Sequence, residues 1–457
     1  MPSELFRTTL GAICERQGGA IQTGPFGSQL HASDYIAAGT PVVMPADIVG
    51  GRVSTTSIAR VGTEHVERLS QHQLRLNDVV FSRRGDVTRF ALVTAREVGW
   101  LCGTGCLKVR VGTGDLALPE WISLALGAPE VKEWLVRHAV GATMPNLNTA
   151  ILGALPLAVP PIERQREAVE MCFALDDRIN LLRDTNDTLE TIAKALFKSW
   201  FIDFDPVRAK ADGLEPEGMD ATTAALFPNE FQKSPLGLVP KDWHVDEVGR
   251  TVECVGGGTP STKQTAYWAP AVHHWATPKD LSGLGSPVLL DTERRLSDAG
   301  LAKVSSGLLP PGTLLMSSRA PIGYLALAQV PLAVNQGFIA MKPGGALPPL
   351  FLYFWCQAHM DAIKQKANGS TFMEISKAAF RPIPLVVPPK EVVGRFVEVA
   401  GPLFGRIAEG DLHRAKLIEL RDALLPRLVS DRVLTNGEDL QEEALASSER
   451  AMADAAL

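Results

Sequence analysis

The stretch LPLAVPPIERQREAVEMCFALDDRINLLRDTNDTLETIAKALFKSWFIDF, residues 155–204, decides the fold. Its first seven residues include three prolines, which favour an extended backbone over a helix. No Pro or Gly follows until after Asp205, and apolar residues recur at helical steps at Val169, Cys172, Ile179, Leu182, Leu189, Ala193, Leu196 and Trp200. This spacing predicts a helix of about 58 Å with a narrow apolar seam. Such a helix needs a partner along its length.

The partner is predicted within the same chain. Residues 383–389, IPLVVPP, align with LPLAVPP, and a second helical run follows over Glu391–Val429. In this register Leu189 falls on Leu417, Ile192 on Leu420, Leu196 on Leu424 and Trp200 on Leu428. The chain therefore uses one plan twice: a mixed unit, a proline-rich connection and a long helix. We expect the seam of the two helices to contain Ile179, Leu182, Leu189, Leu196, Trp200, Leu417, Leu420, Leu424 and Leu428.

The two helical runs differ in regularity. Gly394, Gly401-Pro402, Gly405 and Gly410 interrupt the second run, so we expect its first half to be kinked or broken and only His413–Val429 to be regular. Asn186 falls on the seam of the first run, where a polar residue can set the register, although a frayed surface asparagine is an equal alternative. The polar face of the first run mixes both charges and is typical of a solvated surface.

The predicted fold class is α+β: two pseudo-repeated α+β units separated by two long helices that pack antiparallel as a coiled-coil-like spacer. Short β-rich runs and Gly-rich turns dominate residues 1–154, with one helical stretch over Glu120–Ala139. The predicted boundaries are 1–160 for the first unit, 161–205 for the first helix, 206–240 for a linker, 241–388 for the second unit, 389–430 for the second helix and 431–457 for an acidic tail expected to be disordered.

Charge is distributed unevenly along the chain. The net charge is −6, yet Asp203–Glu230 and Asp431–Leu457 each hold seven acidic and two basic residues. The rest of the chain is thus mildly basic, which permits binding to nucleic acid. The sequence has no membrane-spanning apolar run and no signal peptide, so we expect a cytoplasmic protein. The six cysteines are scattered, which favours reduced, buried thiols over a metal site.

Candidate binding residues lie in turns of the two units. In the first unit they are Thr23 and Ser28 in a Gly-Pro-Phe-Gly turn, and Arg83, Arg84 and Arg89 around a turn that follows a strand. Arginine forks suit phosphate oxygens and the O6/N7 edge of guanine, while solvated surface arginines are an equal alternative. The second unit offers Thr259, Ser261, Lys263, Arg319, Tyr324, Asn335 and Gln336 at matching places. Asn and Gln suit adenine, but a structural turn is favoured for Asn335.

Motifs of an enzyme are missing. The sequence has no phosphate-binding loop, no Asp/Asn-Pro-Pro-aromatic tetrapeptide of an amino-methyltransferase and no Gly-rich cofactor loop after a strand. His273 and His274 lack the spacing that places two ligands on one helix face. Asp203 and Asp205 lie beside Pro206, where ending the helix is the favoured role. The sequence therefore predicts a chain without catalytic chemistry and without a metal.

The whole arrangement resembles the specificity subunit of Type I restriction–modification systems. The resemblance covers about Phe6 to Leu428. Its strongest carriers are the turns Gly24–Ser28 and Gly257–Ser261 and the two proline-rich connections, which are duplicated in register, together with Trp200–Arg208. It implies that each unit is a target recognition domain that reads one half of a bipartite, asymmetric DNA site. The candidate turn residues named above are then DNA-contact candidates, and the helices set the distance between the domains.

The resemblance also implies partners and cofactors. Two methyltransferase subunits would dock on the helices and supply S-adenosylmethionine and catalysis. Motor-nuclease subunits would join for cleavage with ATP and Mg²⁺, and this chain itself would hold no cofactor. A structural adaptor that joins two proteins through its helices is the alternative from another class. A self-sufficient modification enzyme is disfavoured by the missing motifs.

Overall fold

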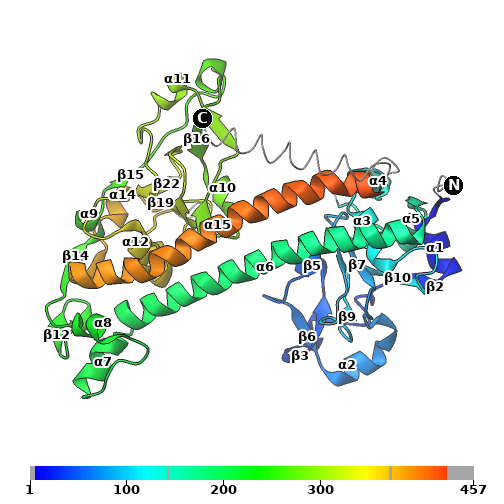
Figure 1. Cartoon of the computed structure of the whole chain (residues 1–457), viewed down its shortest axis with the longest axis horizontal. Helices are drawn as coiled ribbons and strands as arrows, with labels where there is room; N and C mark the ends of the chain where they lie inside the picture. Colours follow the sequence, from blue (N-terminus) through cyan, green and yellow to red (C-terminus); the bar gives the residue numbers. More distant parts are fainter. Residues whose placement is uncertain (1–5, 142–143, 370–372, 430–457) are drawn as a thin grey trace. The chain divides into compact units, whose positions relative to one another are not determined.

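The computed structural model describes residues 6–141, 144–369 and 373–429, and Figure 1 shows its helices and strands. Contacts between residues divide the chain into two units, here called unit 1 (residues 1–178 and 417–457) and unit 2 (residues 179–416). Two 40-residue helices, α6 (Ile162–Phe201) and α15 (Lys390–Val429), each contribute to both units. Each unit is therefore built from one globular region together with one part of each long helix.

Unit 1 contains three small sheets and a hairpin. β1 (Phe6–Thr9) pairs with β11 (Pro156–Val159). A four-stranded sheet has the order β2 (Gly18–Thr23), β10 (Cys106–Gly112), β7 (Val79–Ser82), β8 (Phe90–Leu92), and a three-stranded sheet has the order β6 (Ala59–Val61), β3 (Tyr35–Val43), β9 (Leu101–Cys102). The hairpin is β4 (Ile48–Val49) and β5 (Arg52–Val53). The helices are α1 (Leu10–Arg16), α2 (Thr63–Arg68), α3 (Pro119–Leu126), α4 (Pro129–His138) and α5 (Thr149–Gly153), with 3₁₀ turns at Ala32–Asp34, Pro45–Asp47 and Ser70–His72.

Unit 2 has equivalent sheets in the same strand order. β14 (His244–Glu247) pairs with β23 (Pro384–Val387). The large sheet runs β15 (Cys254–Val255), β22 (Phe338–Met341), β19 (Leu314–Ser317), β20 (Leu325–Ala328), β17 (Val288–Leu289), and the small one runs β18 (Arg294–Leu296), β16 (His273–Ala276), β21 (Leu332–Val334). The helices are α7 (Asp205–Ala211), α8 (Ala221–Ala225), α9 (Val248–Thr251), α10 (Pro278–Ser282), α11 (Asp298–Leu301), α12 (Pro349–Ala358), α13 (Met360–Gln365) and α14 (Lys377–Phe380), with a 3₁₀ turn at Thr265–Tyr267.

The strand orders confirm the predicted duplication. β1–β11 corresponds to β14–β23, and β2-β10-β7-β8 corresponds to β15-β22-β19-β20, to which unit 2 adds β17. In both small sheets the last strand is parallel to the central one, as β9 is to β3 and β21 is to β16. The proline-rich connections form β11 and β23, and each of these strands pairs with only one other strand. Proline is tolerated there because the unpaired side of such a strand needs no backbone N–H group for a hydrogen bond within the sheet. The α+β class predicted from the sequence is confirmed.

The two long helices pack antiparallel within each unit. In unit 1, Cys172 near the start of α6 shares a buried cluster with Leu428 near the end of α15. In unit 2, Phe197 near the end of α6 shares a cluster with Phe396 near the start of α15. Arg421 and Asp176 form an ion pair of 2.9 Å between the helices in unit 1. Early residues of one helix therefore meet late residues of the other, as expected for the predicted pair.

α15 is one continuous helix, so the predicted break in its first half was wrong. Val392, Phe396, Ala400 and Ile407 are all fully buried at helical spacing against the core of unit 2. This apolar face outweighs the low helix propensity of the glycines, which costs about 1 kcal/mol each. Tertiary packing, which the local pattern of Gly and Pro does not reveal, therefore decides the conformation here.

Asn186 occupies the seam between the helices in unit 2, which settles the alternative of a surface asparagine. Its side chain is 7 % exposed, and Nδ2 donates to the carbonyl of Ile407 and to Oδ1 of Asp411, both at 3.1 Å. Asp411 is also buried, pairs with Arg414 at 2.9 Å and accepts a hydrogen bond from Ser286. A Cβ on Gly410 would lie 2.5 Å from Oδ1 of Asn186, so this glycine makes room for the asparagine.

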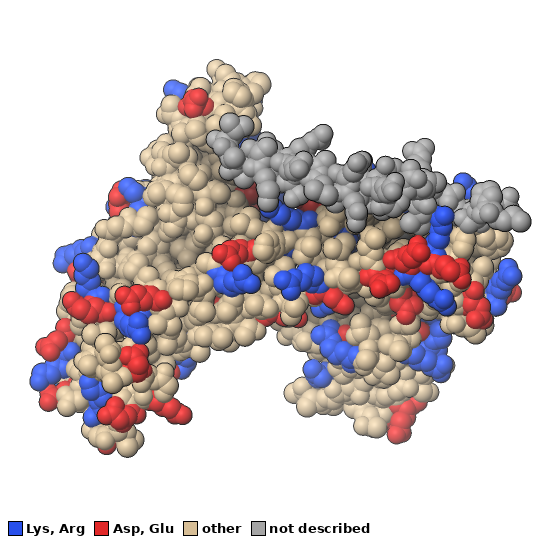
Figure 2. All heavy atoms as spheres, in the orientation of Figure 1, with Lys and Arg blue, Asp and Glu red and all other residues tan. Residues whose placement is uncertain are grey.

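The remaining residues predicted for the seam are all buried or half-buried except one. Ile179, Leu182, Trp200 and Leu428 are buried, and Leu189, Leu196, Leu417 and Leu424 are half-buried. Leu420 is the exception, since its side chain is 41 % exposed. Its counterpart Ile192 is 50 % exposed, so the two copies agree that this position faces outward. On the face drawn in Figure 2, acidic and basic side chains are mixed along the long helices, as in the solvated face that the sequence predicted.

Residues 206–240, predicted to be a free linker, are folded in unit 2. Val207 and Phe227 are buried in the core of unit 2, and Lys210 donates hydrogen bonds to the carbonyls of Ala224 and Phe227. The segment ends in a hairpin of β12 (Phe231–Ser234) and β13 (Gly237–Pro240). Acidic and Gly-rich composition suggested a linker, but the few apolar residues are enough to dock the segment. The other predicted boundaries remain predictions, and the tail 431–457 lies outside the described residues.

Candidate nucleic-acid interface

A row of loops lies at one edge of the four-stranded sheet of unit 1, where β2 and β7 end and β10 begins. The loops follow β2, β7 and α4 and precede β10, and backbone hydrogen bonds join them. The amide of Arg83 donates to the carbonyl of Gly105 at 2.8 Å, and the amide of Leu147 donates to the carbonyl of Arg83 at 2.9 Å. The amide of Gly103 donates to the carbonyl of Val43 at 2.9 Å. The loops therefore have fixed positions relative to one another, which a binding edge requires.

Unit 2 repeats these three hydrogen bonds at equivalent positions. The amide of Ser318 donates to the carbonyl of Gly337 at 2.8 Å, and the amide of Ile375 donates to the carbonyl of Ser318 at 3.0 Å. The amide of Asn335 donates to the carbonyl of Ala276 at 3.0 Å. Of the predicted candidates, Arg83 in unit 1 and Asn335 in unit 2 make these bonds themselves, and Arg84 and Arg319 follow directly after Arg83 and Ser318.

A glycine allows close backbone approach in both rows. A Cβ on Gly24 would lie 2.0 Å from the carbonyl oxygen of Gly103, and one on Gly257 would lie 1.6 Å from that of Val334. No side chain fits at either distance without displacing backbone. The glycines of the two predicted turns are therefore explained by contact with the neighbouring loop, and Thr23, at the end of β2, and exposed Ser28 flank this contact in unit 1.

The three arginines of unit 1 differ in how their side chains are used. Nε of Arg83 donates to Oδ1 of Asn146 and to the carbonyl of Leu147, both at 3.2 Å. Arg89 pairs with Asp86 at 3.1 Å, and hydrogen bonds from Thr88, followed by Arg89, lower the pKa of that carboxyl group. Arg84 is exposed and its guanidinium contacts no partner among the described residues. Among the described residues the donors of Arg84 are therefore unused, while Arg83 positions the loop after α4.

In unit 2 four candidates have side-chain contacts, and one of these contacts joins two candidates. Oγ1 of Thr259 donates to Oε1 of Gln336 at 2.6 Å, which joins the Gly-rich turn to the turn after β21. Oδ1 of Asn335 accepts from the amide of Gly337 at 2.8 Å, which matches the structural turn favoured for it. Arg319 pairs with Glu374 at 3.5 Å.

The other three candidates of unit 2 lie around the same loops. The carbonyl of Ser261 accepts a hydrogen bond from the indole of Trp268 at 3.1 Å. Lys263 is exposed. Tyr324 is half-buried, and its amide donates to Oγ of Ser317 at 2.8 Å.

Two tryptophans and an arginine that the sequence patterns did not indicate brace the Gly-rich turn of unit 2. Nε1 of Trp275 donates to the carbonyl of Gly258 at 3.1 Å, as Nε1 of Trp268 does to Ser261. The two rings meet edge to face with centroids 5.2 Å apart. Cζ of Arg294 lies 3.6 Å from the ring centroid of Trp268 and 5.4 Å from that of Trp275. Aromatic and basic residues between 268 and 295 were a usable signal, but only the pairing of β16 with β18 brings them together.

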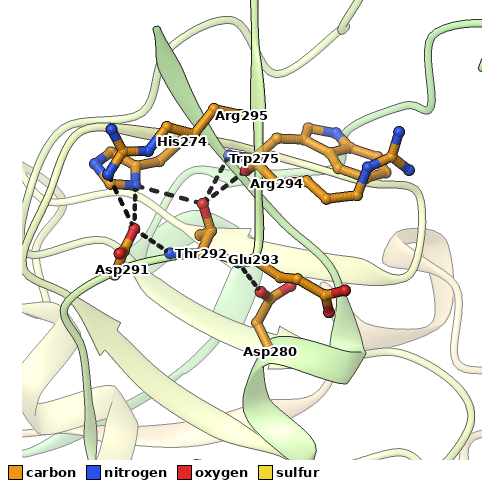
Figure 3. A network of polar contacts seen from close by, with 8 residues as sticks. All are labelled: His274, Trp275, Asp280, Asp291, Thr292, Glu293, Arg294 and Arg295. Carbon is orange, nitrogen blue, oxygen red and sulfur yellow. Dashed lines mark hydrogen bonds and ion pairs between the residues drawn. The ribbon is translucent and has the colours of Figure 1, made fainter. Parts of the chain in front are cut away.

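A polar network fixes these two strands (Figure 3). Oγ1 of Thr292 donates to the carbonyl of Arg294 at 2.8 Å and accepts from the amide of Trp275 at 3.2 Å. His274 and Arg295 both contact Asp291, at 3.1 and 3.3 Å. Burial lowers the pKa of His274 and Arg295 lowers it further, while Asp291 opposes this shift. The imidazole is thus held as part of the strand pair.

The described residues offer no site for metal chemistry. Within residues 6–141, 144–369 and 373–429, no group of three or more His, Cys, Asp or Glu side chains could hold a metal ion. His273 and His274 contact different carboxylates, those of Asp298 and Asp291. The six cysteines are unpaired and buried, and burial raises the pKa of each thiol. No helix in the described part of the chain is both long enough and apolar enough to cross a membrane.

A repeated α+β unit with polar loops on a sheet edge, joined by antiparallel helices, defines a class of two-domain recognition subunits. The family model described as "Type I restriction modification DNA specificity domain" matches residues 39–191 and 240–398. The match covers more than half of the chain, and the chain therefore belongs to this family. The resemblance found in the sequence is confirmed. The chain is a specificity subunit of a Type I restriction–modification system, in which partner subunits carry out catalysis, and neither the adaptor nor the self-sufficient enzyme is favoured.

Relatives and a solved structure agree with this assignment. The chain is 27 % identical over 362 residues to the "Type I restriction enzyme HindI specificity subunit" of Haemophilus influenzae, over 70 % of this chain and 78 % of the relative. It is 36 % identical over 164 residues to the "Type I restriction enzyme MjaIX specificity subunit" of Methanocaldococcus jannaschii, over 35 % and 38 % of the two chains. The crystal structure of a Type I S subunit from M. genitalium has the same fold, with a TM-score of 0.57, 13 % identity and coverage of 94 % and 97 %.

Proposed function

We propose that each unit reads one part of a bipartite, asymmetric DNA site through its row of loops. The observation that carries this proposal is the repetition of the same three backbone hydrogen bonds in units 1 and 2. When two domains read different base sequences of the same kind of ligand, we expect the backbone of their loops to be alike and the side chains of those loops to differ. DNA and other subunits of the restriction–modification system are the partners of such a chain.

The exposed donors of each row are the candidates for DNA contact. Arg84 in unit 1 and Lys263 in unit 2 have free cationic groups suited to phosphate or guanine. Thr23, Ser28, Thr259, Ser261, Tyr324 and Gln336 supply hydroxyl and amide groups along the same edges. The side chains of Arg83, Arg89, Arg319 and Asn335 already have intramolecular contacts, so we assign them mainly to shaping the loops.

The long helices complete the proposal. α6 and α15 would fix the number of base pairs between the two parts of the site and would provide docking surfaces for two methyltransferase subunits. S-adenosylmethionine would bind to those subunits, and ATP with Mg²⁺ to motor-nuclease subunits, with no cofactor on this chain. We place the complex in the cytoplasm because its DNA substrate lies there.

An exchange of one unit tests this assignment. Replacing residues 244–387, from the start of β14 to the end of β23, with the matching segment of another family member leaves α6 and α15 intact. The complex with its methyltransferase subunits should then methylate a motif with one new half and one unchanged half at unchanged spacing. Exchange of residues 6–159 should change the other half instead. Sequencing of methylated genomic DNA measures both results, and an unchanged motif in both chimaeras would refute the proposal.

A further inference from the structure

The side chain of Arg294 lies against the indole rings of two tryptophans. Its guanidinium carbon lies 3.6 Å from the ring centroid of Trp268 and 5.4 Å from that of Trp275. Figure 3 shows the guanidinium beside the Trp275 indole. Arg294 is exposed, and its side chain has no hydrogen bond or ion pair with the described residues. Stacking thus restricts this side chain without using any of its five N–H groups.

Neighbouring cations in unit 2 are neutralised by acidic partners. Arg295, the next residue on β18, pairs with Asp291 at 3.3 Å, and Lys279 pairs with Glu293 at 2.7 Å. Because successive side chains of a strand point to opposite faces, Arg294 and Arg295 are directed to opposite sides of the small sheet. A stacked arginine without an acidic partner beside paired ones indicates a preorganised anion contact.

The stack is directly connected to the loops proposed to read DNA. The same two indoles donate through Nε1 to the carbonyls of Gly258 and Ser261, at 3.1 Å each. Thr292 fixes the backbone of Arg294 through its carbonyl at 2.8 Å. Arg294, the two indoles and the Gly-rich turn therefore form one rigid corner of unit 2.

Unit 1 lacks this feature at the equivalent place. In unit 2, Trp275 on β16 pairs with Arg294 on β18, whereas in unit 1 Val42 on β3 pairs with Ala59 on β6. The strand orders of the two small sheets are equivalent, so Ala59 occupies the place of Arg294. Any contribution of Arg294 must then be confined to the part of the DNA site that unit 2 reads.

We propose that Arg294, held by Trp268 and Trp275, is a DNA-contacting arginine specific to the half-site of unit 2. This inference rests on the proposed function. The ligand chemistry is a pair of adjacent acceptors, which is offered either by two phosphate oxygens or by O6 and N7 of a guanine. The stacked plane limits the orientations of the fork and reduces the entropy lost on binding.

The test uses the full chain assembled with its methyltransferase subunits. Arg294→Met keeps an apolar cover on Trp268 but removes the charge and donors, and Arg295→Met is the matched control on the opposite face of the strand. Affinity for a duplex that contains the bipartite site should fall by about 10-fold or more for R294M, and by less than about 3-fold for R295M. Arg294→Lys should lie between wild type and R294M, because it keeps the charge without the planar fork.

Two further measurements identify the acceptor. A phosphate contact predicts equal weakening on every sequence and a slope of log affinity against log salt that is smaller by about 1. A guanine contact predicts that R294M also methylates sites altered at one base pair in the half-site of unit 2, with the other half unchanged. Either result supports a DNA-contacting Arg294.

Three results would overturn the inference. In the first, R294M has the same affinity for DNA and the same methylated motif as R295M, while the wild-type complex still methylates one bipartite site. This result would refute the role of Arg294 and leave the proposed function intact. The second is a thermal unfolding temperature of R294M well below that of R295M, with weakening on both half-sites, which would assign Arg294 to the fold alone. The third is a wild-type complex that protects no bipartite site, which would refute the proposed function and this inference together.

Discussion

In units 1 and 2 the same backbone hydrogen bonds fix the loops at the edge of the sheet, but the side chains of these loops differ. The loop after β7 begins with Arg83 and Arg84, and its equivalent after β19 begins with Ser318 and Arg319. The backbone amides of Arg83 and Ser318 nevertheless make the same hydrogen bond to the loop before the neighbouring strand of the sheet, β10 in unit 1 and β22 in unit 2. The contacts that fix the loops use the main chain, so the side chains are free to differ. This separation allows one fold to serve two different parts of a DNA site.

The largest loss of stability is expected at the two glycines where neighbouring backbone leaves no room for a side chain. Gly257→Ala would place a Cβ 1.6 Å from the carbonyl oxygen of Val334, and Gly24→Ala would place one 2.0 Å from that of Gly103. Because backbone must move in either case, each substitution should cost roughly 3 kcal/mol or more of unfolding free energy. Chemical denaturation of the full chain measures the loss, and the methylated motif should lose specificity in the half read by the altered unit.

A second glycine in each of the two turns provides a matched control for this prediction. A Cβ on Gly258 or on Gly27 would have no other atom within 4 Å, so Gly258→Ala and Gly27→Ala should unfold close to wild type. If all four variants behave alike, close approach of the loops does not constrain the two turns.

The repeated plan could be predicted from the sequence because it depends on local signals. The connections LPLAVPP and IPLVVPP and the periodic apolar residues after them identify β11, β23 and the two long helices. The break in α15 and the free linker over 206–240 were wrong, since both conformations depend on packing against residues distant in sequence. Arg294 was missed for a related reason. Its contact with Trp268 and Trp275 requires the register of β16 on β18, which no local pattern specifies.

The second prediction concerns a place where the helices depart from the repeat. Gly410 in α15 corresponds to Leu182 in α6, and Asn186 in α6 corresponds to Arg414 in α15. Gly410→Ala should displace the buried Asn186 amide and cost roughly 1–3 kcal/mol. Gly405→Ala, at an exposed position with open space, should instead stabilise the chain by up to about 1 kcal/mol. Urea denaturation distinguishes these opposite signs, and equal effects would show that the Asn186 contact is unimportant.

The third prediction compares the arginines at equivalent positions in the loops after β7 and β19. The guanidinium of Arg84 has no partner in the part of the chain that the structure describes, whereas Arg319 pairs with Glu374 at 3.5 Å. Arg84→Ala should weaken DNA binding by about 1–3 kcal/mol, and Arg319→Ala by less than about 1 kcal/mol, because its charge is already partly compensated. Titration of the assembled complex with the cognate duplex measures both. A larger loss for Arg319→Ala would mean that Glu374 releases this arginine on binding.

The smallest effect is expected from pH, and it arises from one buried histidine in each unit. Burial lowers the pKa of His72 in unit 1 and of His274 in unit 2, and the nearby cations Lys108 and Arg295 lower them further. Folding thus favours the neutral rings, and stability is lost as pH falls below 6.5, the ordinary value at which the unfolded chain takes up protons. Asp291 partly offsets this shift for His274, and a backbone hydrogen bond with Thr23 partly offsets it for His72. His72→Gln and His274→Gln should therefore each reduce the loss of stability between pH 7.5 and 5.5. Urea midpoints at the two pH values measure both reductions, and an unchanged loss in either variant would show that folding does not favour the neutral ring at that position.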